Sequence, residues 1–183
     1  KEKYMNVIVG ETKRMDRLVL DMLENSKLEA GAEKLNMKEY SLTKIANKYI
    51  RIFDEAFRQK NITVKTDIKK DFTAVFDCDK IEQVFSNFLS NALKNTPVNG
   101  EITINIKQNG DKIYVSVENT GENILPEELD KIWDKFYKCD KARGRKDSGT
   151  GLGLSIAKNI LILHNANFGA ENTENGVRFY FEI

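Results

Sequence analysis

The sequence predicts a two-layer α/β sandwich: one mixed, mostly antiparallel sheet with helices on one face, preceded by one long helix. Helical segments are interspersed with short strands along most of the 183 residues. Two pairs of strands are joined across Asn-Gly, which favours tight hairpins and therefore antiparallel pairing. A proline-free stretch with apolar residues at helical spacing opens the sequence. The length suits one domain with an appendage.

The first 30 residues predict one long helix that needs a partner. Apolar or small residues recur there at alternating steps of three and four, the spacing of a coiled-coil or bundle seam. The seam consists of Met5, Ile8, Thr12, Met15, Val19, Met22 and Ser26. A single helix cannot bury its own seam, so we expect a second helix beside it. Because the sequence begins at Lys1 within this pattern, we expect a truncated helical segment.

Four further helices and six strands are expected from apolar spacing and turn residues. Ser41 and Asp79 are the N-cap candidates for two helices, and Pro126 opens a short one. The expected helices cover about residues 42–60, 79–95, 126–133 and 153–164. Alternating apolar residues predict the strands. They cover about residues 62–68, 72–76, 101–107, 112–118, 168–172 and 177–183.

Composition argues against several classes of protein. The chain has 29 Lys and Arg against 28 Asp and Glu, a net charge of +1, which gives no support for binding nucleic acid. No apolar run approaches the ~20 residues of a membrane-spanning helix. Cys78, Cys139 and the single histidine, His164, cannot fill a four-ligand zinc site unaided. We expect both thiols to be reduced and His164 to be structural.

The predicted helix after Asp79 carries polar residues opposite its apolar stripe. Asn87, Asn91 and Lys94 follow at i, i+4 and i+7, which places them within roughly 60° of one another. Amide oxygens are hard ligands, and an ammonium group offsets phosphate charge. This face therefore indicates a site for a cation bound to a polyphosphate. A solvated helix face is the alternative.

Three later segments add glycines and positive charge. Asn119-Thr120-Gly121 ends a strand, and its glycine allows the backbone to approach a flat ligand. Gly149, Gly151 and Gly153 open the last helix, where bare amides bind phosphate. The run matches neither a P-loop nor a dinucleotide fingerprint. Residues 134–147 carry a net charge of +3, so we expect 138–148 to form a lid ordered by an anion.

In this order and spacing the motifs resemble the catalytic and ATP-binding domain of bacterial sensor histidine kinases. The resemblance covers about residues 36–183 and implies the fold shared by histidine kinases, gyrase and heat-shock ATPases. Residues 87–94 look like the N box, 119–124 the first glycine box, 136–138 the F box and 148–154 the second glycine box. Residues 1–30 resemble the second helix of the dimerisation and phosphoacceptor hairpin. Residues 134–145 and 168–172 resemble envelope-stress and glycopeptide-resistance sensors.

The resemblance implies ATP and Mg²⁺ as cofactors and transfer of the γ-phosphoryl group to a histidine on the missing upstream helix. Asn91, helped by Asn87, would bind Mg²⁺, and Lys94 and Lys138 would contact phosphate oxygens. The other nucleotide-binding residues implied are Asn95, Asn119, Gly121, Asn123, Ile124, Phe136, Tyr137, Gly149, Thr150, Gly151, Leu152, Gly153 and Leu154.

This sequence departs from the family pattern at three of these positions. Asn119 replaces the aspartate that accepts a hydrogen bond from adenine, Asn123 replaces a glycine, and Asn95 stands where an aromatic residue often stacks. An uncharged amide is a weaker acceptor than a carboxylate. We therefore expect weaker nucleotide binding than is usual in the family.

The resemblance also implies partners and a location. These are a response regulator, a homodimer through the helical hairpin of the parent protein, and the cytoplasmic side of a bacterial inner membrane anchored by upstream segments. Two alternatives stay open. An ATP-hydrolysing domain of the gyrase, mismatch-repair or chaperone kind would carry a glutamate at position 87 to activate water, which an amide cannot do. A nucleotide-binding module without turnover is the other.

Overall fold

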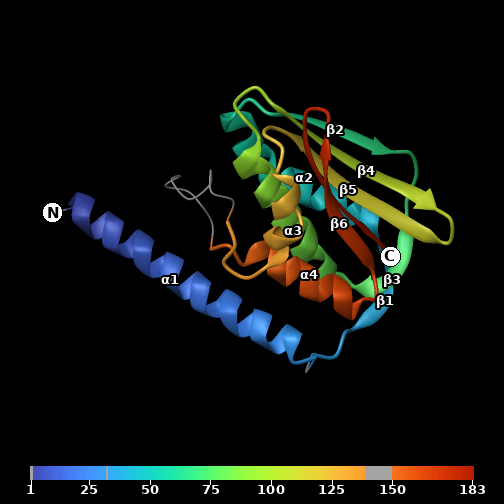
Figure 1. The fold of residues 1–183 in the computed structure, drawn as a ribbon, viewed down its shortest axis with the longest axis horizontal. Helices are drawn as coiled ribbons and strands as arrows, with labels where there is room; N and C mark the ends of the chain where they lie inside the picture. The colour runs from blue at the N-terminus through green and yellow to red at the C-terminus, as the bar shows by residue number, and fades with distance from the viewer. Residues whose placement is uncertain (1, 32, 139–149) are drawn as a thin grey trace.

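The computed structural model describes residues 2–31, 33–138 and 150–183. Its main body is a sheet covered on one face by helices, and a long first helix runs beside this body (Figure 1). The helices are α1 (Glu2–Glu29), α2 (Leu42–Gln59), α3 (Cys78–Asn95) and α4 (Gly153–Leu163). The strands are β1 (Met37–Ser41), β2 (Thr63–Ile68), β3 (Thr73–Asp77), β4 (Glu101–Asn109), β5 (Lys112–Thr120), β6 (Asn167–Thr173) and β7 (Gly176–Glu182).

The main sheet has five strands in the order β2-β4-β5-β7-β6. Only the β2–β4 pair is parallel, so the expected mixed, mostly antiparallel sheet is confirmed. β3 lies outside it and pairs antiparallel with β1 in a separate two-stranded sheet. The prediction of one sheet was incomplete because β1, Met-Lys-Glu-Tyr-Ser, is largely polar and exposed and carries no strand pattern.

Two local predictions were wrong. The N-cap of α3 is Asp77, whose Oδ1 accepts from the Lys80 amide at 3.2 Å, and not Asp79, which lies in the first turn. The expected helix over 126–133 is instead two 3₁₀ turns, η1 (Pro126–Glu128) and η2 (Lys131–Trp133). So short a segment cannot sustain an α-helix by itself. The expected N-cap Ser41 is confirmed, since its hydroxyl accepts from the Lys44 amide at 3.0 Å.

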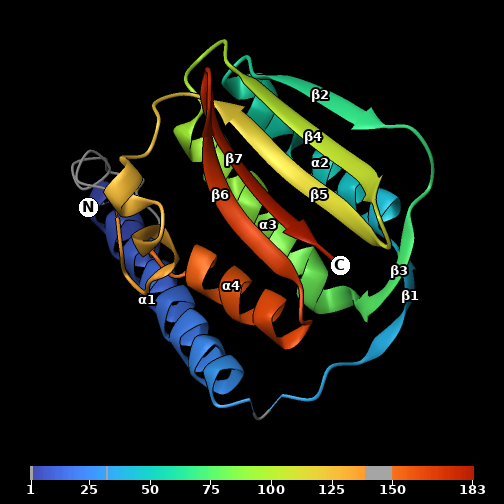
Figure 2. The ribbon, with the colours of Figure 1, turned by 45° about the vertical axis from the view of Figure 1, so that its right-hand side comes forward.

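The core lies between the sheet and the helices that cover it. Figure 2 shows α2 and α3 along one face of the sheet and α4 beside α3. Phe88 of α3 is 1% exposed, and its ring centroid lies 5.6 Å from that of Phe179 and 6.3 Å from those of Trp133 and Phe181. Such aromatic packing supplies much of the apolar burial in a domain of this size. It holds α3, η2 and β7 in fixed relative positions.

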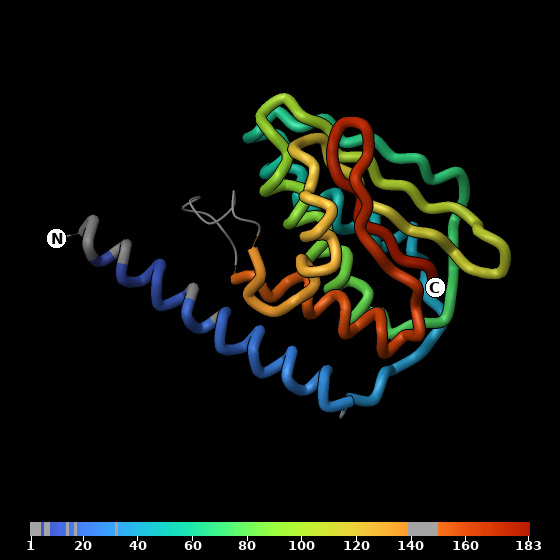
Figure 3. The backbone as a smooth tube through the Cα atoms, in the orientation of Figure 1, coloured from blue at the N-terminus to red at the C-terminus, as the bar shows by residue number. Residues whose placement is uncertain are grey.

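The first helix contacts the body through its C-terminal half. Figure 3 traces α1 from its free N-terminal end to the turn before β1. Asn25 and Leu28 are buried against the body. The apolar residues Met5, Ile8, Met15, Val19 and Met22 are exposed.

Among the described residues, no helix combines the length and the apolar character that crossing a membrane requires.

Candidate functional site

The polar face of α3 forms one wall of the candidate site. Asn87 and Asn91 are half-buried, whereas Lys94 and Asn95 are exposed. Asn95 Nδ2 donates to the side-chain and backbone oxygens of Asn91, both at 2.9 Å. Asn87 Nδ2 is buried and makes no hydrogen bond to any described residue. A buried amide group without a partner calls for a ligand or water.

The start of α4 lies directly against this wall. A Cβ at Gly153 would stand 3.1 Å from Asn87 Oδ1, so a larger residue would press on that side chain. The turn at the start of α4 also contacts the segment 135–138. Gly151 has φ +78°, and a Cβ there would lie 3.0 Å from the Cα of Phe136. The Phe136 amide donates to the Gly151 carbonyl at 3.0 Å. The N box, the F box and the second glycine box therefore meet.

The first glycine box joins the other end of α3. Gly121 has φ +152°, and a Cβ there would lie 2.8 Å from the carbonyl oxygen of Asn95. Asn119 is 2% exposed, and its Nδ2 donates to the Thr120 carbonyl at 3.0 Å. Only glycine allows this close approach in this backbone conformation. The end of β5 is thus held against the end of α3.

Two residues that the sequence analysis did not assign to the site hold the first glycine box and the C-terminal end of α3 in place. Asn172 of β6 brackets Ile124, accepting from its amide at 2.9 Å and donating to its carbonyl at 2.7 Å. The Lys60 ammonium donates to the carbonyls of Leu93 at 2.7 Å and Thr96 at 2.9 Å, which satisfies the end of α3. Both are long-range contacts of polar residues, for which no sequence spacing gives a signal.

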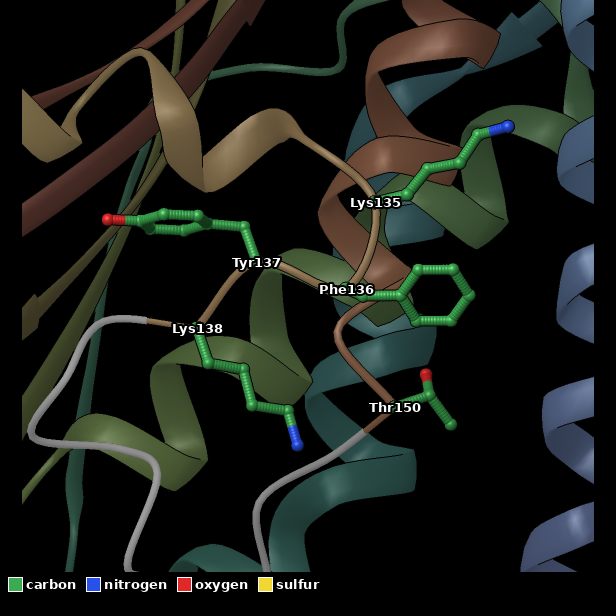
Figure 4. A pocket seen from close by; sticks show the side chains of 5 residues that line it. All are labelled: Lys135, Phe136, Tyr137, Lys138 and Thr150. Carbon is green, nitrogen blue, oxygen red and sulfur yellow. The ribbon is translucent and has the colours of Figure 1, made fainter.

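An open cavity of about 500 Å³ lies between the F box and the second glycine box. Lys135, Phe136, Tyr137, Lys138 and Thr150 line it (Figure 4). Phe136 has φ +61°, a left-handed conformation that costs a non-glycine residue about 1–3 kcal/mol. Strain of this size persists only where the surroundings enforce it, and it is typical of functional turns.

The leucines of the second glycine box pack against the hydrophobic core. Leu152 is fully buried and Leu154 is half-buried against the core, so their side chains anchor the turn. The Thr150 hydroxyl accepts from the Leu152 amide at 3.3 Å and donates to Asp21 of α1 at 3.3 Å. Gly149 and the expected lid beyond Lys138 lie outside the described residues.

His164 has the structural role expected of it. It is buried at the C-terminal end of α4, where Nδ1 donates to the Ile160 carbonyl at 2.8 Å. Nε2 then accepts from the Asp77 amide at 3.1 Å, which requires a neutral ring. Burial lowers the pKa of His164 more than the Ile160 carbonyl and Asp77 raise it. The ring therefore links the end of α4 to the start of α3.

The donor set of the site fits a magnesium ion bound to phosphate. Mg²⁺ takes few protein oxygens and completes its octahedron with substrate phosphates and water. Asn87 and Asn91 each offer an amide oxygen on one helix face. No cluster of three or more His, Cys, Asp or Glu in the described ranges could hold the metal instead.

The family model described as histidine kinase-, DNA gyrase B- and HSP90-like ATPase matches residues 76–183. Among solved structures, the catalytic domain of histidine kinase ThkA is 36% identical, with a TM-score of 0.72 over 81% of this chain and 95% of that one. ThkA in complex with response regulator protein TrrA is 34% identical, with a TM-score of 0.78 over 99% of this chain and 50% of that one.

Full-length relatives are also similar. Sensor histidine kinase WalK of Bacillus subtilis is 35% identical over 174 residues, 94% of this chain. The chain spans only 28% of that relative's length. The similarity therefore bears on a domain, and the activity and partners of a whole protein need a separate argument.

Proposed function

Since this chain belongs to the histidine kinase-, DNA gyrase B- and HSP90-like ATPase family, and within it to the catalytic domains of bacterial sensor histidine kinases, we propose that it transfers the γ-phosphoryl group of ATP to a histidine ring nitrogen. The acceptor would lie on the upstream helix of a phosphoacceptor hairpin, whose second helix corresponds to residues 1–30. Residues 36–183 form the catalytic unit.

One observation carries the proposal: the polar face of α3 presents amide groups at positions 87 and 91, and Asn87 lies against Gly153 of the second glycine box. Asn87 Nδ2 is a buried donor with no partner among the described residues, which supports a phosphate oxygen or a water as its acceptor. Asn91 and Asn87 would hold Mg²⁺ through their amide oxygens, and the ion would supply positive charge against the charge that develops during transfer.

The remaining residues bind and orient the nucleotide. Lys94 and Lys138 offset phosphate charge, and the amides from Gly149 to Leu154 cradle the phosphate tail at the start of α4. Asn119 accepts from the adenine amino group without a charge. The other residues around the nucleotide are Asn95, Gly121, Asn123, Ile124, Phe136, Tyr137, Thr150, Gly151, Leu152 and Gly153. Positioning and electrostatics of this kind do most of the work in phosphoryl transfer.

Residue 87 favours transfer over hydrolysis. Hydrolases of the same family need a general base for the attacking water, and an amide cannot accept a proton. Asn87 therefore argues against the gyrase, mismatch-repair or chaperone kind of turnover. Asn87 is half-buried beside Gly153, so an amide and not a carboxylate stands at this position of the candidate site.

In this proposal the acceptor histidine lies outside the catalytic unit of residues 36–183, on the upstream helix of the hairpin. His164 is the only histidine in the 183 residues, and its two ring nitrogens are engaged in buried hydrogen bonds. We propose that the phosphoryl group moves on to a response regulator. The exposed α1 seam would complete a homodimeric hairpin bundle on the cytoplasmic side of a bacterial inner membrane.

Transfer can be tested by incubating the chain with γ-³²P-ATP, Mg²⁺ and a separately purified phosphoacceptor hairpin. Acid-labile, base-stable label should appear on the hairpin and not on the chain. Label on the chain that His164→Ala removes would contradict the proposal. Free phosphate released without the hairpin would favour the hydrolase, and nucleotide binding with neither product would favour a non-catalytic module.

A further inference from the structure

Glu128 is a buried residue that contacts Tyr137, one of the residues that line the cavity. It ends the η1 turn, where its amide donates to the Leu125 carbonyl at 2.8 Å, and the residue is 9% exposed. Its Oε1 accepts from the Tyr137 hydroxyl at 2.8 Å. A carboxylate is a strong acceptor, and a buried one requires a donor. The position of the Tyr137 ring is therefore tied to the η1 turn.

In the sequence, Tyr137 lies between Phe136, whose backbone is strained, and Lys138, which lines the cavity. Phe136 before it has φ +61°, and Lys138 after it lines the cavity. The hydrogen bonds that hold this turn include the Phe136 amide to the Gly151 carbonyl, the Tyr137 amide to the Asp134 carbonyl and the Tyr137 hydroxyl to Glu128. Figure 4 shows the Tyr137 ring and the Lys138 side chain leaving the turn in different directions. Because the two residues are neighbours, anchoring Tyr137 restrains the backbone from which the Lys138 side chain starts.

We propose that Glu128 is a positioning residue for Lys138. By holding the Tyr137 hydroxyl, it keeps Phe136 in its left-handed conformation and directs the Lys138 side chain into the cavity. Without that anchor, the turn can relax toward ordinary negative φ and carry Lys138 with it. The inference rests on the proposed function, which gives Lys138 a terminal phosphate to contact.

The test compares the affinities of the whole chain for two nucleotides with Mg²⁺, by calorimetry: AMPPNP, a non-hydrolysed ATP analogue, and ADP. The readout is the ratio of the ADP Kd to the AMPPNP Kd. Lys138→Ala should lower this ratio by at least about tenfold, the range of one charge-assisted contact. Glu128→Ala and Tyr137→Phe should lower it in the same direction. Glu128→Gln should retain most of it, because the amide oxygen still accepts from the tyrosine.

Two controls separate positioning from general stability. Glu127→Ala removes an exposed carboxylate from the same η1 turn and should leave the ratio unchanged. Glu128→Ala placed in the Lys138→Ala background should produce no further change, because the two residues act on one contact. A thermal unfolding curve of each variant reports whether it folds.

Several outcomes would overturn the inference. Equal losses of AMPPNP and ADP affinity in Glu128→Ala, or additive effects in the double variant, would leave Glu128 with a structural role only. If Glu128→Ala fails to fold, Tyr137→Phe decides, since it removes one hydroxyl from the same bond. Nucleotide binding with a ratio unaffected by Lys138→Ala would refute the positioning role alone. No nucleotide binding by the unmodified chain would refute the proposed function as well.

Discussion

Helices α1 and α3 use their polar and apolar sides in opposite ways. α3 buries Phe85, Phe88 and Leu89 in the core and turns its amides toward the candidate site. α1 exposes most of its large apolar residues and turns polar residues toward the body. Asn25 is 1% exposed there, where it accepts from Asn159 at 2.6 Å and donates to Ser155 at 3.1 Å.

This difference between the two helices shows that apolar burial stabilises a helix, whereas polar contacts fix its orientation. Apolar burial stabilises α3 in a way that does not depend on direction, whereas hydrogen bonds contribute less net energy and require specific geometry. α3 is therefore a fixed wall of the site. α1 is held in one orientation largely by polar contacts, and of its apolar residues Leu28 is the one buried in the core in the described part of the chain.

The largest effect should come from truncating the buried side of α3. Phe88→Ala should lower the free energy of unfolding by about 3–5 kcal/mol because it opens a cavity among Trp133, Phe179 and Phe181. Met15→Ala on the exposed side of α1, where Met15 is 67% exposed, should change it by less than about 0.5 kcal/mol. Urea unfolding measures both, and similar losses would show that the seam of α1 is packed in solution.

A medium effect should come from the polar contact between α1 and α4. Asn25→Ala leaves the Asn159 amide without its acceptor, which costs about 1–3 kcal/mol. We expect amide exchange in the second half of α1 to accelerate about 5- to 150-fold while exchange in α3 stays unchanged. The exposed neighbour Ser26→Ala is the control. Equal acceleration in α3 would mean that the two helices unfold together.

Acid should weaken the α3–α4 framework and spare the α1 contact. Burial holds the folded pKa of His164 below its ordinary value, so the unfolded chain takes up the proton first. The contribution of His164 to stability is therefore complete above about pH 6.5 and is lost as the pH falls toward the folded pKa. The urea concentration at the unfolding midpoint should fall as the pH is lowered through this range, and His164→Gln should make the midpoint less dependent on pH. A midpoint that rises on acidification would contradict the neutral state assigned to the buried ring.

The smallest effect should come from the exposed ion pair at the end of α1. Glu29 and Lys135 lie 2.5 Å apart, but both side chains are about 40% exposed. Water screens such a pair, so Glu29→Gln should cost less than about 1 kcal/mol of α1 docking, and added salt should remove the difference. Amide exchange of the last turn of α1 provides the measurement. A loss as large as that of Asn25→Ala would mean that charge rather than the buried amide holds α1.

The sequence predicted the placement of the candidate residues wherever their spacing along the chain converts directly into one face of a helix. Asn87, Asn91 and Lys94 lie together because α3 is helical, and the glycines of the two glycine boxes fit the close approaches at Gly121, Gly151 and Gly153. Membership of the family agrees with the resemblance that these motifs carry.

The rest could not be predicted because it depends on contacts far apart in sequence. β1 pairs with β3 through a polar segment that carries no alternation. Asp77 rather than Asp79 caps α3, since both carboxylates precede the same apolar run and only the tertiary contact to His164 separates them. The braces Asn172 and Lys60 act on loops that only the fold brings near.

The central claim is that the polar side of α3 binds a metal-nucleotide complex and is more than a solvated face. Calorimetric titration of AMPPNP into the chain, with and without Mg²⁺, tests it most directly when repeated on Asn91→Ala. The account predicts Mg²⁺-dependent binding that Asn91→Ala abolishes, with the unfolding free energy changed by no more than about 0.5 kcal/mol because the residue is outside the core. Unchanged affinity for the Mg²⁺ complex in Asn91→Ala would contradict it.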